Sequence, residues 1–331
     1  MARDQWAYSI SRRGFCRASL SILIAPRIVM AQGSLRVRHI GVLDSGRAST
    51  PEEIREEAEP LRQLGWVEGG NLHVERRFDN RQPERLHALA EELVRASVEI
   101  IVTSGTAATL AAKRATTTIP IVIRSSGDPV LLGLVASLAR PGGNVTGFSV
   151  AGPEVFAKEL SLLKELLPRL ERIGLMWEVG NRYARATRSQ VEQLCQSAHL
   201  VPTFAEIGAA GEIDAAIVQL VRQRVQAVVL YSSAFMIDHG VEIVGAATKQ
   251  GLPTMALEEE GGALIIYSPT DAEASRVRAD YIDRILRGAK PADLPVQQPT
   301  QFELIINLKT ATALGIAVPQ SLFLRADKVI R

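Results

Sequence analysis

Short apolar runs alternate with amphipathic stretches from residue 37 to residue 148, and this alternation constrains the fold more than any other feature of the sequence. Each run has the length of a strand, and the stretches between the runs have the length and apolar spacing of crossover helices. The pattern predicts strands at 37–44, 71–78, 98–103, 119–123 and 145–148, with helices at 52–64, 83–95, 107–115 and 130–139. Strands joined by such helices pair in parallel, in a sheet that is covered on both faces.

The same pattern begins again after residue 150. It predicts helices at 153–167, 183–198, 213–224 and 235–250, with strands at 172–177, 200–205, 227–231 and 253–256. A late strand at 263–267, a long helix at 271–287 and a further strand at 302–307 follow. We therefore expect an α/β protein with two doubly wound parallel-sheet lobes, joined by a hinge because the late elements can return the chain to both lobes.

The composition excludes several classes of protein. Lys and Arg number 38 while Asp and Glu number 36, so the formal net charge of +2 provides no basic field for nucleic acid. No apolar run reaches the roughly 20 residues that span a bilayer. The two cysteines, Cys16 and Cys195, are too few for a disulfide framework or a four-ligand zinc site.

The first 31 residues have the three parts of an export signal. A basic segment contains adjacent Arg12 and Arg13 with Phe15 two residues on, an apolar stretch covers 18–25, and a small-residue cleavage site ends at Ala31. The paired arginines are similar to the twin-arginine motif. We predict a twin-arginine-type signal peptide over residues 1–31 and a periplasmic mature protein, with an uncleaved basic tail as the alternative.

Polar residues follow the predicted strands of both lobes, where ligands bind in open α/β sheets. They occur at 44–46, 104–106 and 125–128 in the first lobe and at 178–181 and 231–233 in the second. Several hydroxyl side chains among them precede or open helices, whose free backbone N–H groups favour a carboxylate or another anion. Each could instead be an ordinary helix cap or turn residue. As a set on one edge they predict a ligand cleft.

Motifs for catalysis or cofactor binding do not occur. The segment 41–46 lacks the third glycine of a dinucleotide fingerprint, and the sequence has no Gly-Lys-Ser/Thr phosphate loop, no His-Glu-x-x-His and no Gly-x-Ser-x-Gly. The five histidines are scattered without the spacing of metal ligands. We therefore expect no cofactor, no metal, no catalytic residue and no enzymatic activity.

Several stretches resemble one family, the substrate-binding proteins of bacterial ABC transporters with the type I periplasmic-binding fold. The most specific stretch is GDPV at 127–130 with LARPGGNVTG at 138–147. Others lie at 61–69, 101–106, 290–296 and 302–310, so the resemblance covers nearly all of residues 36–331. The branch that it points to includes proteins assigned as aromatic-amino-acid binders.

The resemblance implies a bilobed receptor that traps a small molecule by hinge closure and, when closed, docks on an ABC permease in the membrane. The lobes would consist of residues 36–149 with 270–294 and of residues 150–269 with 295–331. The chain would cross between them near Ser149, Pro269 and Leu294. We expect a monomer, because capture needs only one cleft. We expect no nucleic-acid partner, because the net charge provides no basic field.

The resemblance also implies which residues contact the ligand. The expected contacts are Ser45, Ser104, Gly105, Thr106, Ser126 and Asp128 in the first lobe and Asn181, Tyr231 and Ser232 in the second.

The sequence departs from the family pattern at three places. Glu178 follows Trp177, where the family often has Asn, and the loop 257–262 is short and lacks aromatic residues. Arg124 ends a strand where a small residue is usual, so it could face the cleft and bind an anion or lie on the surface. The orientation of Glu258 is open in the same way. These departures leave the ligand class open between an amino-acid-like molecule and an organic anion.

Two other functions stay open. The same fold could serve a sensor that reports ligand binding to a signalling partner, or it could carry an enzyme. Turnover of a captured small molecule would favour the enzyme. A sugar-responsive repressor of this fold would carry an N-terminal DNA-binding helix pair, where this sequence has the predicted signal.

Overall fold

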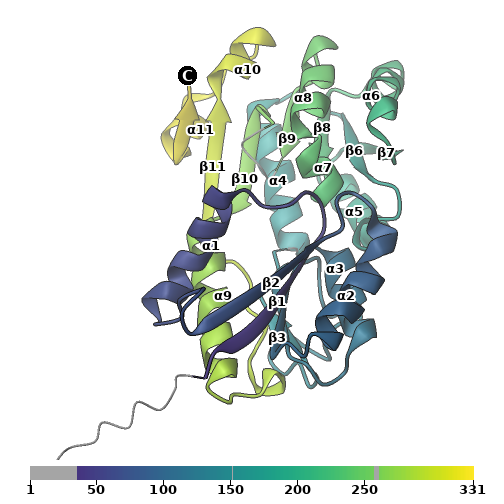
Figure 1. Ribbon diagram of the computed structural model, residues 1–331. Helices are drawn as coiled ribbons and strands as arrows, with labels where there is room; N and C mark the ends of the chain where they lie inside the picture. The colour runs from purple at the N-terminus through teal and green to yellow at the C-terminus, as the bar shows by residue number, and fades with distance from the viewer. Residues whose placement is uncertain (1–35, 151, 257–260) are drawn as a thin grey trace, which may run out of the picture. The chain divides into compact units, whose positions relative to one another are not determined.

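Parallel strands form two separate sheets in the computed structural model (Figure 1). The structure describes residues 36–150, 152–256 and 261–331. The predicted signal peptide, residues 1–31, and Glu258 lie outside the described residues. Residues 37–331 form one compact unit.

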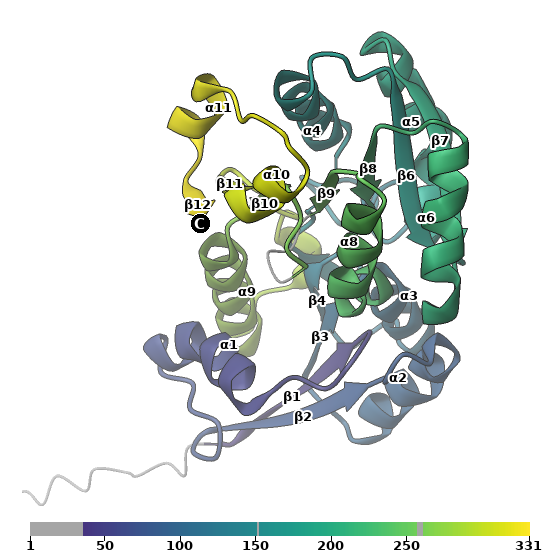
Figure 2. The same ribbon diagram turned by 90° about the horizontal axis from the view of Figure 1, so that it is seen from above.

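The first sheet has the strand order β2-β1-β3-β4-β5, and all its neighbouring strands run parallel. Its strands are β1 Arg38–Asp44, β2 Leu72–Phe78, β3 Ile100–Ser104, β4 Ile121–Ser125 and β5 Val145–Gly147. Its helices are α1 Pro51–Gln63, α2 Leu86–Arg95, α3 Thr106–Ala115 and α9 Asp271–Leu286, with 3₁₀ turns η1 Pro83–Arg85 and η3 Pro291–Asp293. Helices α1 and α9 cover one face and α2 and α3 the other (Figure 2). We call this sheet with its helices lobe one.

The second sheet has the order β12-β11-β10-β9-β8-β6-β7, in which β10 and β11 pair antiparallel and the other neighbours parallel. Its strands are β6 Arg172–Glu178, β7 Val201–Ile207, β8 Ala227–Leu230, β9 Thr254–Ala256, β10 Ile265–Pro269, β11 Phe302–Asn307 and β12 Lys328–Ile330. Its helices are α4 Pro153–Leu166, α5 Arg182–Ser197, α6 Ile213–Arg222, α7 Ala234–Asp238, α8 Gly240–Lys249, α10 Leu308–Ala313 and α11 Gln320–Arg325, with the turn η2 Ala210–Glu212. Helices α4 and α5 cover one face and α6 to α8 the other. We call this sheet with its helices lobe two.

Apolar side chains on both faces of the central strands explain why these strands read as continuous apolar runs. In β3, Ile101 faces α2 and α3 while Ile100 and Val102 face α1 and α9, and Ile100 and Ile101 are fully buried. Burying each such side chain stabilises the fold by about 1.5–3 kcal/mol. A strand buried on both faces requires helices above and below it, as the sequence pattern predicted.

Helix α9 follows β10 of lobe two in the sequence but packs on lobe one. Ile282 is buried against the first sheet, and the Tyr281 hydroxyl donates a hydrogen bond to the carbonyl of Pro295. Gln297 then pairs with Phe148 just beyond β5. The chain therefore passes between the lobes after β5, after β10 and after Gln297.

Two predicted helices differ from the structure. Turns replace the predicted helix at 130–139, because the Asp128 carboxylate accepts the N–H of Val130 (2.8 Å) and Leu134 donates to the carbonyl of Pro129 (2.7 Å). Leu134 is nevertheless 2% exposed. The apolar spacing therefore predicted the burial of this segment correctly, whereas the predicted helix was wrong. The helix predicted at 235–250 is divided into α7 and α8.

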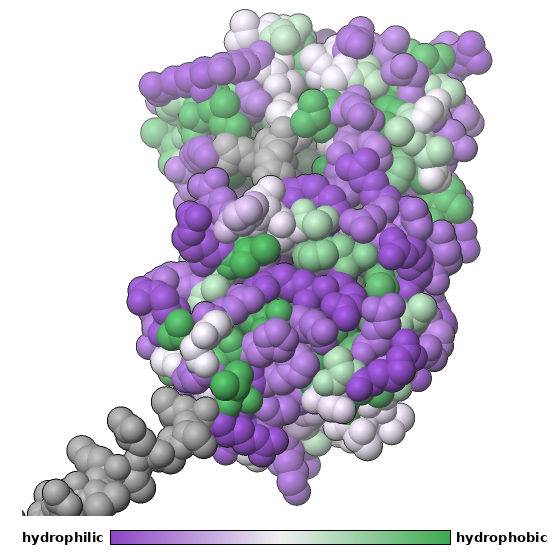
Figure 3. Space-filling model, viewed as in Figure 1, coloured by the Kyte–Doolittle hydropathy of each residue, from purple (hydrophilic) through white to green (hydrophobic). Residues whose placement is uncertain are grey.

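The surface seen in Figure 3 is mostly polar, with apolar side chains in small separate patches. Exposed large apolar residues include Leu64, Val67 and Val241, while most of the large apolar side chains fill the cores on both faces of each sheet. Within the described ranges, no helix has the length and apolar character to cross a membrane.

Candidate functional site

Serine and threonine side chains gather at the carboxyl edge of the first sheet. Ser104 and Ser125 end the neighbouring strands β3 and β4, and their hydroxyls lie 3.5 Å apart. The hydroxyls of Thr106 and Ser126 lie 3.4 Å apart at the start of α3. Ser45 follows β1, next to β3, and its backbone N–H donates to the carbonyl of Ser104 (3.3 Å). The structure therefore brings the predicted lobe-one hydroxyls together on one edge.

Gly105 lies inside this group because its backbone requires glycine. Its φ is +88°, in the region that L side chains avoid, and an added methyl group would approach the Ser45 hydroxyl oxygen to 3.3 Å. Its N–H donates to the carbonyl of Ser125 (2.9 Å). The glycine thus keeps the edge open between β1 and α3.

Three buried hydroxyls at this edge and at the crossings between the lobes make no hydrogen bond within the described part of the chain. They belong to Ser45, Ser149 and Thr270. Leaving a buried hydroxyl unpaired costs about 1–3 kcal/mol, so such groups call for a partner. A polar ligand held between the lobes could provide it.

Other predicted contacts stabilise their own turns or helices. Asp128 accepts two backbone N–H groups of the turn that follows it, from Val130 (2.8 Å) and Leu131 (3.0 Å). Asn181 caps α5, because its side-chain oxygen accepts the N–H of Ala184 (3.0 Å). Ser232 is exposed after β8.

Tyr231 is the predicted lobe-two residue with the most extensive packing. Its ring centre lies 5.8 Å from that of Trp177, edge-on, and 6.0 Å from that of Phe156. Burial raises the pKa of its hydroxyl above the ordinary range. Tyr231 therefore belongs to an aromatic group at the carboxyl edge of the second sheet.

The two edges touch at residues outside the predicted contacts. An ion pair joins Arg81 Nε to Asp238 Oδ2 at 2.9 Å, and a methyl group on Gly46 would lie 3.2 Å from the Ala234 Cβ. Asp79 shapes this loop by accepting the N–H groups of Gly46 (2.7 Å) and Arg81 (3.0 Å). The sequence contained a signal for this contact, because Asp79 and Arg81 follow β2 at the same carboxyl edge as the predicted residues.

A second contact joins Gly127 of lobe one to Tyr183 of lobe two. A methyl group on Gly127 would lie 2.4 Å from Cγ of Tyr183, so only glycine lets the ring lie there. Tyr183 is two residues beyond Asn181, and its aromatic ring was the available signal. The two lobes therefore contact each other at this point.

Acidic side chains surround the contact between Arg81 and Asp238. Burial raises the pKa of Asp79, and the nearby charge of Asp238 adds to the rise. Burial also raises the pKa of Glu178, with the charge of Asp79 adding to it. These carboxylates repel one another, and the Arg81 guanidinium beside Asp238 offsets part of that repulsion.

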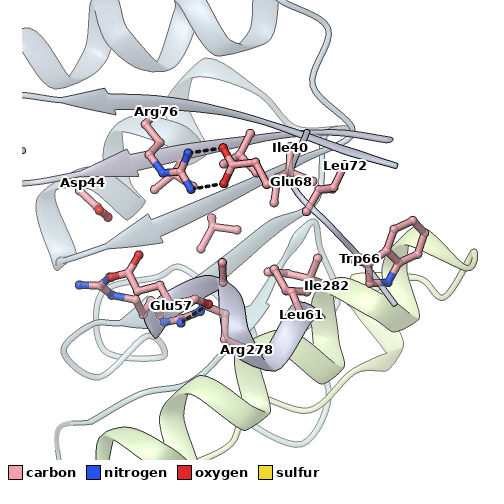
Figure 4. A pocket seen from close by; sticks show the side chains of 15 residues that line it. Ile40, Asp44, Glu57, Leu61, Trp66, Glu68, Leu72, Arg76, Arg278 and Ile282 are labelled. Atoms are coloured by element: carbon pink, nitrogen blue, oxygen red, sulfur yellow. Dashed lines mark hydrogen bonds and ion pairs between the residues drawn. The ribbon is translucent and has the colours of Figure 1, made fainter. Parts of the chain in front are cut away.

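A cavity of about 530 Å³, open solvent included, lies within lobe one between the sheet and helices α1 and α9 (Figure 4). One end is apolar and the other charged. Its lining includes Ile40, Leu61, Trp66, Leu72 and Ile282 at the apolar end and Asp44, Glu57, Glu68, Arg76, Arg124 and Arg278 at the charged end.

Arg124 lines this cavity, where it pairs with Glu57. Burial raises the pKa of Asp44 to about 6, although Arg124 opposes the rise, and burial lowers the pKa of Arg278 to about 10. Arg76 holds Glu68 through two hydrogen bonds of 2.6 and 2.8 Å. Three arginines thus face three acids, so this cluster compensates its own charge.

Cys195 and His239 lie outside the lobe-one edge and contact their own surroundings in lobe two. Cys195 is buried in the lobe-two core, where burial raises the pKa of its thiol to about 11. His239 contacts Glu242 at 2.9 Å on α8. In the described part of the chain, no three His, Cys, Asp or Glu residues are placed to hold a metal ion.

Comparisons with known proteins agree with this architecture. A family model described as ABC transporter substrate binding protein matches residues 53–330. The chain belongs to this family. The family expected from the motifs is therefore confirmed.

One relative is a tyrosine-binding protein from Clostridioides difficile (strain R20291), 26% identical over 261 residues, which cover 77% of this chain and 74% of the relative. A solved conserved domain protein from Vibrio cholerae has a TM-score of 0.82 at 25% identity and covers 89% of this chain and 100% of its own. A domain from Streptococcus pneumonia in complex with L-Trp has a TM-score of 0.80 at 23% identity, covering 88% and 99%. These likenesses confirm the predicted fold of two parallel-sheet α/β lobes.

Proposed function

We propose that this substrate-binding protein is an exported receptor that captures a small molecule between its lobes and delivers it to an ABC permease by hinge closure. The observation that carries the proposal is the meeting of two strand-end edges, joined by Arg81 and Asp238, with unpaired buried hydroxyls beside them. Such an edge is where open α/β sheets bind ligands.

Closure follows from differential affinity. A ligand that contacts both lobes only when they are together stabilises the closed state and shifts the equilibrium toward it. The three passages of the chain between the lobes would absorb the movement as a hinge. The closed form would then be the one that docks on the permease.

An amino acid fits the lobe-one edge. The hydroxyls of Ser104, Thr106 and Ser126 and the N-terminus of α3 offer donors to a carboxylate. Two similar proteins point the same way, because one is named for tyrosine and one was solved with L-Trp. We propose an amino-acid-like ligand, with an organic anion as the other member of the same carboxylate class.

A thermal-shift screen of the purified protein tests the proposal. Amino acids, organic acids, sugars and purines are added singly, and a ligand that binds only the folded state raises Tm. We expect a shift with amino acids or organic acids and a decrease in the radius of gyration by X-ray scattering. Thr106→Ala should weaken that ligand roughly 5- to 30-fold. Thr117→Ala, at an exposed position just after α3 and outside the predicted contacts, is the control and should bind as the wild type does. No shift with any of these classes would contradict an amino-acid-like or organic-anion ligand and would favour a sensor or a ligand outside the panel.

Export is tested separately. We propose that residues 1–31 direct the folded protein to the periplasm, and Arg12→Lys with Arg13→Lys should leave the precursor in the cytoplasm. Fractionation of cells that express the full chain measures this. Normal export of the double variant would contradict a twin-arginine signal.

A further inference from the structure

Glu159 on α4 is a buried acid without a partner. The residue is 8% exposed, and burial is the sole influence on the pKa of its carboxyl group, with no hydrogen bond to it and no charge acting on it from any residue that the structure describes. Its neighbours on the same face of the helix, Leu162 and Leu163, belong to the lobe-two core. Buried acids are normally paired, so an unpaired one indicates a missing partner.

Aromatic rings surround the same place. Phe156, one turn before Glu159 on the same face of α4, packs on Tyr231, and Tyr231 packs on Trp177. Trp177 and Tyr231 lie at the carboxyl ends of β6 and β8, so these rings belong to the edge that meets lobe one. The indole N–H of Trp177 is a second buried polar group without a partner among the described residues.

Among the described residues, acids and phenols lie around Glu159, and no cation acts on it. Burial alone raises the pKa of Glu159 to about 8. Burial is the main cause that raises the pKa values of Tyr183, Tyr231 and Tyr267 above their ordinary range, and the charge of Glu159 adds to the rise in all three. Glu159 therefore lies near all three hydroxyls. Asp128 and Glu154 act on Tyr183 with the same sign. A positively charged group of a ligand would be attracted to this place.

We propose that the Glu159 carboxylate receives the ammonium group of an amino-acid ligand, whose side chain packs against the rings of Phe156, Tyr183 and Tyr231. The inference rests on the proposed function and assigns the residue that selects an amino acid over the corresponding deaminated acid. The lobe-one hydroxyls then hold the carboxylate of the same ligand, so that the two charged ends of the molecule contact different lobes.

Binding in this way releases a proton. The free protein holds Glu159 as the neutral carboxylic acid at pH 7, and the arriving ammonium group favours the carboxylate, so the acid's proton passes to solvent. Charged residues on the packed elements include Glu154 and Lys158 on α4 and Glu192 on α5, and Asp128 acts on Tyr183 from lobe one. Other titratable groups near Glu159 are the hydroxyls of Tyr183, Tyr231 and Tyr267 and the thiol of Cys195, whose pKa values burial raises. Those four groups therefore do not exchange protons near pH 7.

Calorimetry with matched ligands tests the proposal. L-Tyrosine and L-tryptophan are compared with 3-(4-hydroxyphenyl)propionate and indole-3-propionate, which lack only the amino group. The wild type should bind the amino acids at least 30-fold more tightly than their deaminated analogues. Glu159→Gln should remove most of that difference by weakening the affinity for the amino acids roughly 30- to 100-fold.

Proton release is a second readout. Titration in phosphate and in Tris should show release of nearly one proton by the wild type and none by the variant. Glu165→Gln, on the same helix but paired with Arg325, is the control and should behave as wild type.

Equal effects of Glu159→Gln on an amino acid and its deaminated analogue, or no proton release by the wild type, would overturn the inference. The wild-type comparison needs no variant, so it decides the matter even if Glu159→Gln does not fold. If the wild type binds neither amino acid but another solute raises Tm, the inference fails and the solute-binding function stands. If no solute raises Tm, the inference and the proposed ligand class both fail.

Discussion

The cavity of lobe one and the aromatic group of lobe two both contain a buried acid, but they treat its charge differently. In lobe one, Asp44 lies near Arg124 and Arg278 in a cluster of three acids and three arginines. In lobe two, Glu159 lies among apolar side chains, aromatic rings and further acids, and no cation of the described residues acts on it. The compensated cluster needs nothing from outside, whereas the uncompensated acid needs a ligand or a proton.

This difference distinguishes charged groups that stabilise the fold, such as the lobe-one cluster, from a charged group available to a ligand, such as Glu159. Breaking the compensated cluster should cost stability, because it leaves a buried charge without its partner. Neutralising the uncompensated acid should gain stability and lose ligand affinity, as at many functional sites.

Removal of Arg124 should have the largest effect. Arg124→Met takes away the nearest countercharge of Asp44 and Glu57, and we expect the free energy of unfolding to fall by about 3 kcal/mol at pH 7. Urea unfolding measures this. Arg95→Met, which breaks an exposed pair on α2, is the control and should change stability by less than about 0.5 kcal/mol. Equal effects of the two variants would show that the cluster is not compensated.

The pH dependence of stability should distinguish the two acids. Each has a folded pKa above its unfolded value, so each contributes stability below its unfolded pKa that is lost as pH rises through the folded pKa. For Asp44 the loss is nearly complete at about pH 6, whereas for Glu159 it continues to about pH 8. Between pH 6 and pH 8 the wild type should therefore lose about 2 kcal/mol relative to Glu159→Gln. Parallel stability curves for the two proteins would contradict the unpaired state of Glu159.

The contact between the lobes should limit closure. Gly127→Ala places a methyl group inside the ring of Tyr183, so we expect ligand affinity to fall at least 10-fold, about 1.4 kcal/mol, with a larger radius of gyration in the presence of ligand. Gly143→Ala, whose added methyl group meets no atom within 4 Å, is the matched control. Unchanged affinity of Gly127→Ala would mean that the ligand does not require this contact.

The ion pair across the lobes should have the smallest effect. Arg81 is about half exposed, so water screens its attraction to Asp238. A double-mutant cycle with Arg81→Gln and Asp238→Asn should give a coupling energy of about 0.2–1 kcal/mol in ligand affinity. Zero coupling would remove this pair from the closing contact.

Much of the lobe-one edge could be predicted from the sequence. Ser104, Thr106 and Ser126 meet because neighbouring parallel strands end at the same edge, which follows from the order of strands and helices alone. The same reasoning could not tell a ligand contact from a cap. Asp128 and Asn181 also follow strands, yet their oxygens accept backbone N–H groups of their own turn or helix.

The sequence by itself determined the two-lobed α/β fold and the family, because strand and helix periodicity and the glycine-rich motifs are local properties of the chain. Only the tertiary structure decided that Arg124 pairs with Glu57, that Tyr183 lies on Gly127, and that Glu159 lies unpaired near three tyrosine hydroxyls. Those partners are far apart in the sequence, and packing alone sets their distances. The charge of a buried group depends on its neighbours in space, which the order of residues does not state.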